Sequence, residues 1–122
     1  MPATQSLPVI DPGAIAELRA LNPGDNDEFL RDVIGIFLAD TPIRLAELDD
    51  SLAAGDTPKF TRAAHSIKGS SANVGAAALR TAAGNLEHRA RTDGLGDVRA
   101  LVGEVKAEFA RTQVEFAALI AR

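Results

Sequence analysis

Apolar residues recur every three to four positions along most of this chain, which is the period of an amphipathic α-helix. Pro42 lies inside the longest of these patterns, yet the apolar stripe keeps its phase across the proline. We therefore predict one continuous helix kinked at Pro42, rather than a break at which Thr41 caps a new helix. The stripe of this long helix consists of Leu30, Val33, Ile34, Phe37, Thr41, Leu45, Leu48 and Leu52.

Capping residues, prolines and glycines divide the rest of the chain into further helices. Asp11 and Pro12 predict a short first helix, which would lie as a lid across one end or side of the molecule. Asp25 or Asn26 is the predicted cap of the long helix, with Glu28 in its first turn. The remaining helices are expected to begin near Thr57, just after Gly75 and near Asp97, with a loop at 92–96.

Four amphipathic helices with short connections, and no strand pattern beside them, favour an all-α fold. We predict an antiparallel, up-down four-helix bundle with a short additional N-terminal helix. Residues 1–10 are predicted to form an irregular leader, and residues 11–122 a single helical bundle domain. The last two helices are expected to turn inward Leu79, Ala82, Ala83, Leu86 and Ala90, and Val98, Leu101, Val102, Val105, Phe109, Phe116, Leu119 and Ile120.

Composition narrows the location and the classes of partner. The 122 residues contain no cysteine, which excludes disulfides and thiolate metal ligands and is in keeping with a reducing compartment. A formal net charge of −4 argues against nucleic acid as a partner. No apolar run is long enough to span a membrane and no signal sequence opens the chain, so we predict a cytoplasmic protein with no membrane partner.

The charge is unevenly distributed, because no acidic residue lies between Asp56 and Glu87. One interpretation is a solvated face that happens to be basic. The other is a surface that attracts an anionic group or an acidic partner. The basic residues of this segment are Lys59, Arg62, Lys68 and Arg80.

On a helical wheel of the third helix, His65, Lys68, Gly69 and Ala72 share one outward patch. A neutral imidazole is a nucleophile near pH 7, and a lysine one turn away can hold an anion beside it. Gly69, which is also one turn from the histidine, keeps the approach open. The opposing interpretation is an ordinary solvated histidine, since this chain has other glycines within predicted helices. The inward stripe of the same helix is Phe60, Ala64, Ile67, Ser71 and Val74.

The segment 64–76, with the sequence AHSIKGSSANVGA, closely resembles the signature of histidine-containing phosphotransfer (HPt) domains of bacterial and eukaryotic phosphorelays. The resemblance continues at 37–42, at Leu86-Glu87 and in the terminal helix. It implies that His65 accepts a phosphoryl group from the aspartyl phosphate of a receiver domain and passes it to another receiver. Lys68 would steady the phosphoryl oxygens, and Gly69 would give the receiver's active site access.

The same resemblance implies a phosphocarrier that neither binds ATP nor phosphorylates itself. It implies no cofactor or metal in this chain, because Mg²⁺ belongs to the receiver domain. The expected partners are response-regulator receiver domains and a hybrid sensor kinase, bound by a monomer. Ser70, Ser71, Ala72 and Asn73 match the family pattern in supporting roles, and the wheel turns Ser71 inward, toward a backbone carbonyl.

Phe29, Ile36 and Ile43 form a separate apolar stripe on the long helix, spaced seven residues apart. They could pack against the short first helix, or part of the stripe could be an exposed docking patch for the receiver. The sequence leaves both interpretations open. The other histidine, His88, falls opposite the inward stripe of its helix and is predicted to be solvated.

Two other functions fit a helical bundle with an exposed histidine. The dimerisation domain of a sensor histidine kinase usually has an acidic residue directly after the histidine, where this chain has Ser66. A non-catalytic adaptor bundle would bind partners without using His65. A hydrolytic enzyme is disfavoured, because the motif holds no second general acid or base near His65.

Overall fold

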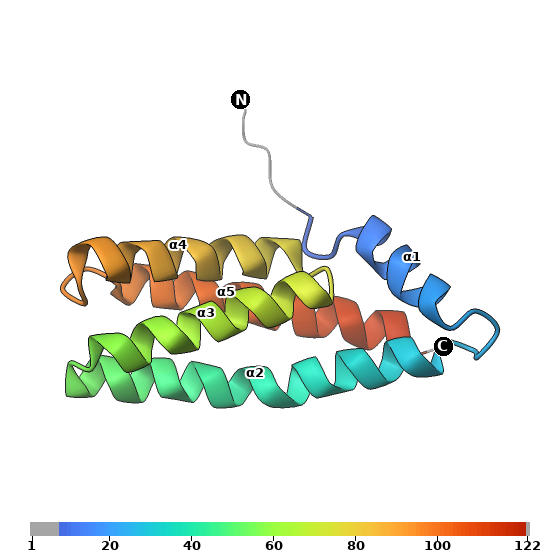
Figure 1. Ribbon diagram of the computed structural model, residues 1–122, viewed down its shortest axis with the longest axis horizontal. Helices are drawn as coiled ribbons and strands as arrows, with labels where there is room; N and C mark the ends of the chain where they lie inside the picture. Colours follow the sequence, from blue (N-terminus) through green and yellow to red (C-terminus); the bar gives the residue numbers. More distant parts are fainter. Residues whose placement is uncertain (1–7, 122) are drawn as a thin grey trace, which may run out of the picture.

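The structure is a computed structural model that describes residues 8–121, and it is an all-α, up-down bundle (Figure 1). α3 packs against both α2 and α4, and α5 packs against α4 and α2, so α5 lies diagonally across the bundle from α3. The predicted fold class is confirmed. Of the predicted leader, residues 1–7 lie outside the described part of the chain. The helices are α1 (Pro12–Leu21), α2 (Glu28–Ala54), α3 (Thr57–Asn73), α4 (Ala77–Asp93) and α5 (Arg99–Ile120).

α2 runs without a break through Pro42, as the phase of its apolar stripe predicts. Pro42 has no N–H to donate to the carbonyl of Leu38, and its ring is exposed. One residue earlier, the buried Thr41 donates its hydroxyl to the Phe37 carbonyl at 2.8 Å. Thr41 therefore satisfies its own hydroxyl inside the helix instead of capping a new one.

The start of α2 differs from the predicted cap. The N-cap is Asp27, which is in the left-handed conformation with φ 63° and makes no capping hydrogen bond with its side chain. Asp25 still serves the helix end, because its carboxylate accepts the N–H of Phe29 at 3.1 Å. Sequence reasoning found the capping carboxylate but placed the cap one or two residues too early.

The bounds of α3 follow from its flanking residues. Asp56 accepts the N–H of Lys59 at 3.1 Å, and Pro58 lies in the first turn. After the helix ends, Gly75 adopts a φ of 72°, and a Cβ there would lie 2.6 Å from the Cβ of Ala14. The Gly75 carbonyl also accepts the N–H of Asp11 at 2.7 Å, so the start of α1 is fixed on the turn between α3 and α4. The predicted lid thus lies across one end of the bundle (Figure 1).

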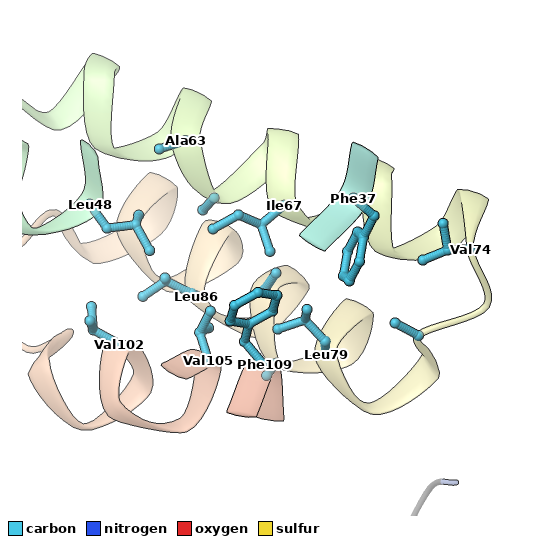
Figure 2. Packing of buried hydrophobic residues seen from close by; sticks show 14 of the residues in the cluster. Phe37, Leu48, Ala63, Ile67, Val74, Leu79, Leu86, Val102, Val105 and Phe109 are labelled. Carbon is cyan, nitrogen blue, oxygen red and sulfur yellow. The ribbon is translucent and has the colours of Figure 1, made fainter. Parts of the chain in front are cut away.

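Apolar side chains from the four long helices pack together along the length of the bundle and form its core. Figure 2 shows Ile67, Leu86 and Phe109 directed into the space between α3, α4 and α5. Phe37 packs edge-on against the rings of Phe109 and Phe116, with centroids 5.9 and 5.8 Å apart. The facing sides of α3 and α4 are lined with small buried residues that allow a close approach, and these are Ala63, Ala64, Ala82 and Ala83.

Candidate functional site

The outer face of α3 exposes His65, Gly69 and Ala72, as the helical wheel predicts. The His65 side chain is 62% exposed, whereas that of Lys68 is 39% exposed because it leans toward α4. The stem of Lys68 passes Gly84 of α4, at a distance of 3.5 Å between the Lys68 Cδ and a Cβ built on the glycine. Lys68 therefore belongs to the groove between the two helices as much as to the open face.

Two of the three serines in the segment 64–76, Ser70 and Ser71, donate to the same backbone oxygen. Ser71 is buried and donates its hydroxyl to the Ile67 carbonyl at 2.6 Å, which is the kind of bond predicted for it. Ser70 donates to the same carbonyl at 3.3 Å. Asn73 is exposed at the last position of α3. These residues serve the helix itself, and none of these bonds involves the imidazole.

Glu87 of α4 is the residue that organises the site, and its side chain is only 7% exposed. Its Oε2 lies 3.0 Å from the Nδ1 of His65 and accepts a hydrogen bond from Nη2 of Arg91 at 2.7 Å. The Nζ of Lys68 lies 2.8 Å from Oε1. The geometry of this last contact is that of an ion pair without an aligned hydrogen bond. One buried carboxylate therefore holds a histidine, a lysine and an arginine.

This arrangement places an acidic side chain beside the segment between Asp56 and Glu87, which carries only basic charges in the sequence. Glu87 ends that segment in the sequence, but α4 packs beside α3 and so places Glu87 next to His65. The statement that the motif holds no second acid or base is true only of the motif. The signal for Glu87 was its phase, because Ala83, Glu87 and Ala90 follow one another on the inward side of α4. A carboxylate on a buried stripe needs partners, and His65, Lys68 and Arg91 provide them.

The ionisation of Glu87 sets the protonation of the imidazole. Burial by itself raises the pKa of Glu87, but its contacts with Lys68, Arg91 and His65 outweigh burial and hold the pKa below its ordinary value. The group is therefore a carboxylate at neutral pH, which can only accept hydrogen bonds. Nδ1 of a neutral His65 must then carry the proton, and the lone pair is on Nε2.

Acid stability provides a direct check of this ionisation. Because the pKa of Glu87 is lower in the folded protein than in the unfolded chain, its stabilisation is present at neutral pH and is lost as pH falls through the folded pKa. We expect Glu87→Gln to lower the free energy of unfolding at neutral pH by about 1–3 kcal/mol. The free energy of unfolding of this variant should also fall less steeply on acidification, as measured by urea unfolding at neutral and acid pH. Glu104→Gln, at an exposed position of α5, should keep the wild-type slope, and equal slopes in all three proteins would contradict the prediction.

The structure decides between the two interpretations of the stripe on α2 for two of its three residues. Ile36 is 69% exposed and Ile43 is 55% exposed, so neither is buried under α1, whereas Phe29 is half-buried. α2 and α3 run antiparallel from the turn at Gly55, and Ile43 and Lys68 are equally far from that turn along their helices. Ile43 is therefore level with the second half of α3, and Ile36 is level with the turn that follows α3.

Other features of the described residues are simpler. His88 is exposed on α4, as predicted. Within residues 8–121, no group of three or more His, Asp or Glu side chains is arranged to hold a metal ion. None of the helices in this part of the chain is long and apolar enough to cross a membrane.

Comparisons with known proteins agree with this fold. The family model described as Hpt domain matches residues 32–115. Histidine-containing phosphotransfer protein B (HptB) from Pseudomonas aeruginosa PAO1 is 33% identical, with a TM-score of 0.82 over 93% of this chain and 95% of that one. Histidine-containing phosphotransfer protein MtHPt2 from Medicago truncatula has the same fold, with 21% identity and a TM-score of 0.82 over 93% of this chain and 78% of that one. A search of curated protein sequences gave no match.

The family match covers more than half of the chain and includes α3, α4 and most of α2 and α5. The likeness to HptB covers nearly all of both chains. The chain therefore belongs to the Hpt domain family, the phosphocarriers through which histidine phosphotransfer proceeds in two-component phosphorelays.

Proposed function

We propose that His65 is the phosphoacceptor of this phosphocarrier. It takes a phosphoryl group from the aspartyl phosphate of one receiver domain and passes it to another. The observation that carries the proposal is the contact of Nδ1 with Glu87 at 3.0 Å on a side chain that is 62% exposed. This contact supports a proton on Nδ1 and a lone pair on Nε2, the proposed nucleophile.

Lys68 is the proposed partner of the phosphoryl oxygens. Phosphoryl transfer depends mainly on positioning and on compensation of negative charge, which an ammonium group supplies. Residues three apart on a helix are neighbours, so Lys68 can reach a group on the imidazole. It is now paired with Glu87, and a doubly charged phosphoryl group on Nε2 would compete for it.

Gly69 is the proposed access position for the receiver. A glycine inside a helix costs about 1 kcal/mol relative to alanine, and a Cβ on Gly69 would meet nothing within 4 Å in this chain. Packing within the protein therefore does not explain the glycine, whereas close approach of a partner does. Ser70, Ser71 and Asn73 are proposed to support the local geometry of α3 rather than take part in the chemistry.

A matched pair of glycine variants tests this role. Gly69 and Gly103 are both exposed within helices, with open space where a side chain would begin, but Gly103 lies on α5. Replacement of either by glutamine should stabilise the fold by roughly 0.5 kcal/mol through helix propensity. Gly69→Gln should lower kcat/KM for phosphoryl acceptance about tenfold or more. The measurement is transfer from a phosphorylated receiver, in reactions quenched at successive times. Equal rates for the two variants would remove Gly69 from the site.

We further propose that the chain has no ATP-dependent or autokinase activity and needs no cofactor of its own, with Mg²⁺ supplied in the receiver domain. The proposed partners are receiver domains and a hybrid sensor kinase, without nucleic acid or membrane, and the proposed location is the cytoplasm. A monomer is the proposed state, because one chain buries the apolar stripes of all four long helices. Gel filtration tests this state against the dimer that a histidine-kinase dimerisation domain requires.

The deciding experiment is incubation of the wild-type chain with a receiver domain carrying radiolabelled aspartyl phosphate. Transfer of label to the chain, in a form labile to acid and stable to base, is expected for phosphohistidine. Binding of several receivers without transfer would favour the adaptor function instead.

A further inference from the structure

Glu87 faces the nitrogen of His65 that does not react in the proposed function. Its carboxylate is nearly inaccessible to solvent, yet it is 3.0 Å from Nδ1. The charged groups around the imidazole are Lys68 on the same helix and Glu87 and Arg91 on α4, with Arg62 exposed one turn earlier on α3. Glu87 is thus the single acid among the charged groups that face the ring from α3 and α4.

The transfer step shows what this acid does. The Nε2 lone pair attacks phosphorus, an N–P bond forms, and the acyl phosphate P–O bond breaks with its electron pair passing to the receiver's aspartate. No proton moves in this step. The Nδ1 proton stays on the ring, which becomes a phosphorylated imidazolium with a positive charge. That charge is next to the Glu87 carboxylate, while Lys68, one turn along α3, can reach the phosphoryl oxygens.

The return step depends on the same proton. When the N–P bond breaks toward a second receiver, its electron pair returns to Nε2. With the proton still on Nδ1, the ring leaves as neutral imidazole. Without it, the ring would have to leave as an imidazolate anion, which is a far poorer leaving group. The retained proton therefore makes transfer away from His65 as feasible as transfer to it.

We propose that Glu87 is a positioning residue that keeps the Nδ1 proton on His65 throughout the phosphorylated state, so that the carrier can also donate its phosphoryl group at and above neutral pH. This inference rests on His65 being the phosphoacceptor. It distinguishes the roles of the charged groups, since Lys68 balances the phosphoryl group, Glu87 balances the ring and Arg91 stays paired with Glu87. In the phosphorylated site these charges nearly cancel, because a phosphoryl group carries about two negative charges.

The test is a ³¹P NMR titration of the phosphorylated protein, prepared with a phosphorylated receiver and then separated from it. The phosphorus shift reports protonation of Nδ1. In the wild type, the midpoint of the Nδ1 titration should lie about one pH unit above that of free Nε2-phosphohistidine. The shift is limited to this size because the Glu87 carboxylate also contacts Lys68 and Arg91. This comparison needs no variant. In Glu87→Gln, whose amide can accept the same hydrogen bond without charge, the midpoint should return toward that of the free compound.

Transfer from the phosphorylated protein to an unphosphorylated receiver should follow the same titration. Above the midpoint of the variant, the rate of Glu87→Gln should be about tenfold below the wild type, while the two should converge at lower pH. Glu104→Gln serves as the control on α5 and should behave as the wild type. A wild-type midpoint equal to that of free phosphohistidine, or a pH-independent loss in Glu87→Gln, would overturn the proposal. Absence of any phosphohistidine signal in the wild type would instead overturn His65 as the phosphoacceptor.

Discussion

Replacement of His65 by glutamine is expected to abolish phosphoryl acceptance, while replacement of His88 by glutamine leaves it unchanged. These are the two histidines of the chain, and both are exposed. They differ in their surroundings. Nδ1 of His65 is paired with a buried carboxylate, so its lone pair is fixed on the outward Nε2. His88 forms no side-chain hydrogen bond or ion pair with residues 8–121, so nothing selects its nucleophilic nitrogen.

The measurement is single-turnover transfer from a labelled phosphorylated receiver to the two variants and the wild type. A glutamine amide has no nucleophilic nitrogen, so no label should reach His65→Gln within the time that saturates the wild type. Both replacements are at exposed positions, so the free energy of unfolding of each variant should stay within about 0.5 kcal/mol of the wild type. His65→Gln should lose in addition only what the contact with Glu87 contributes. Label on His65→Gln at the wild-type level, or loss of label in both variants, would refute the assignment.

The sequence was sufficient for features that depend on one helix at a time. The phase of the stripe across Pro42 predicted an unbroken α2, and the wheel of α3 predicted that His65, Gly69 and Ala72 share an outer face. Both follow from a fixed rotation per residue, which needs no knowledge of neighbouring helices. The bundle then follows from burying the apolar stripes together.

The part that sequence reasoning missed depends on contacts between helices. Glu87 is 22 positions from His65, and nothing local indicates that the two side chains meet. Their meeting requires the close packing of α3 and α4, which the small residues of both helices permit. The pairing of Lys68 with Glu87 was likewise not predicted, because it also depends on the packing of α4 against α3. The predicted exposure of His65, Gly69 and Ala72 is therefore confirmed, whereas the buried carboxylate of Glu87 beside them was not predicted.

The buried carboxylate of Glu87 also explains how Lys68 could change its partner from Glu87 to a phosphoryl group. Glu87 pairs with both Lys68 and Arg91, and so holds two cations near His65. A phosphoryl group on His65, as proposed above, would meet cations that are already ordered, which reduces the entropy lost on binding. Glu87 keeps Arg91 and His65 as partners if Lys68 turns to the phosphoryl group, so no buried charge is left unpaired.

Aspartate at both Ile36 and Ile43 is expected to give the largest loss among surface changes away from the imidazole. The two side chains are 69% and 55% exposed, on the helix next to α3. Because large exposed apolar side chains grouped together mark interaction surfaces, we expect the receiver to bury them when it reaches His65. The double variant should lower kcat/KM for phosphoryl acceptance about 100-fold, mainly through KM, as measured in transfer reactions over a range of receiver concentrations.

Val114→Asp is the matched control for this double variant. Val114 is 70% exposed, but it lies on α5, diagonally across the bundle from α3. The same change of an apolar side chain to a carboxylate should leave transfer unchanged there, and all three positions should tolerate it with little change in stability because they are already solvated. Equal losses for the two proteins would point to a general effect of negative charge on a chain that already carries a net charge of −4. A loss confined to Ile36 and Ile43 assigns the docking face to the side of the bundle where α2 and α3 meet. That face combines an apolar contact for binding with an exposed Nε2 for chemistry, and each can then be altered without the other.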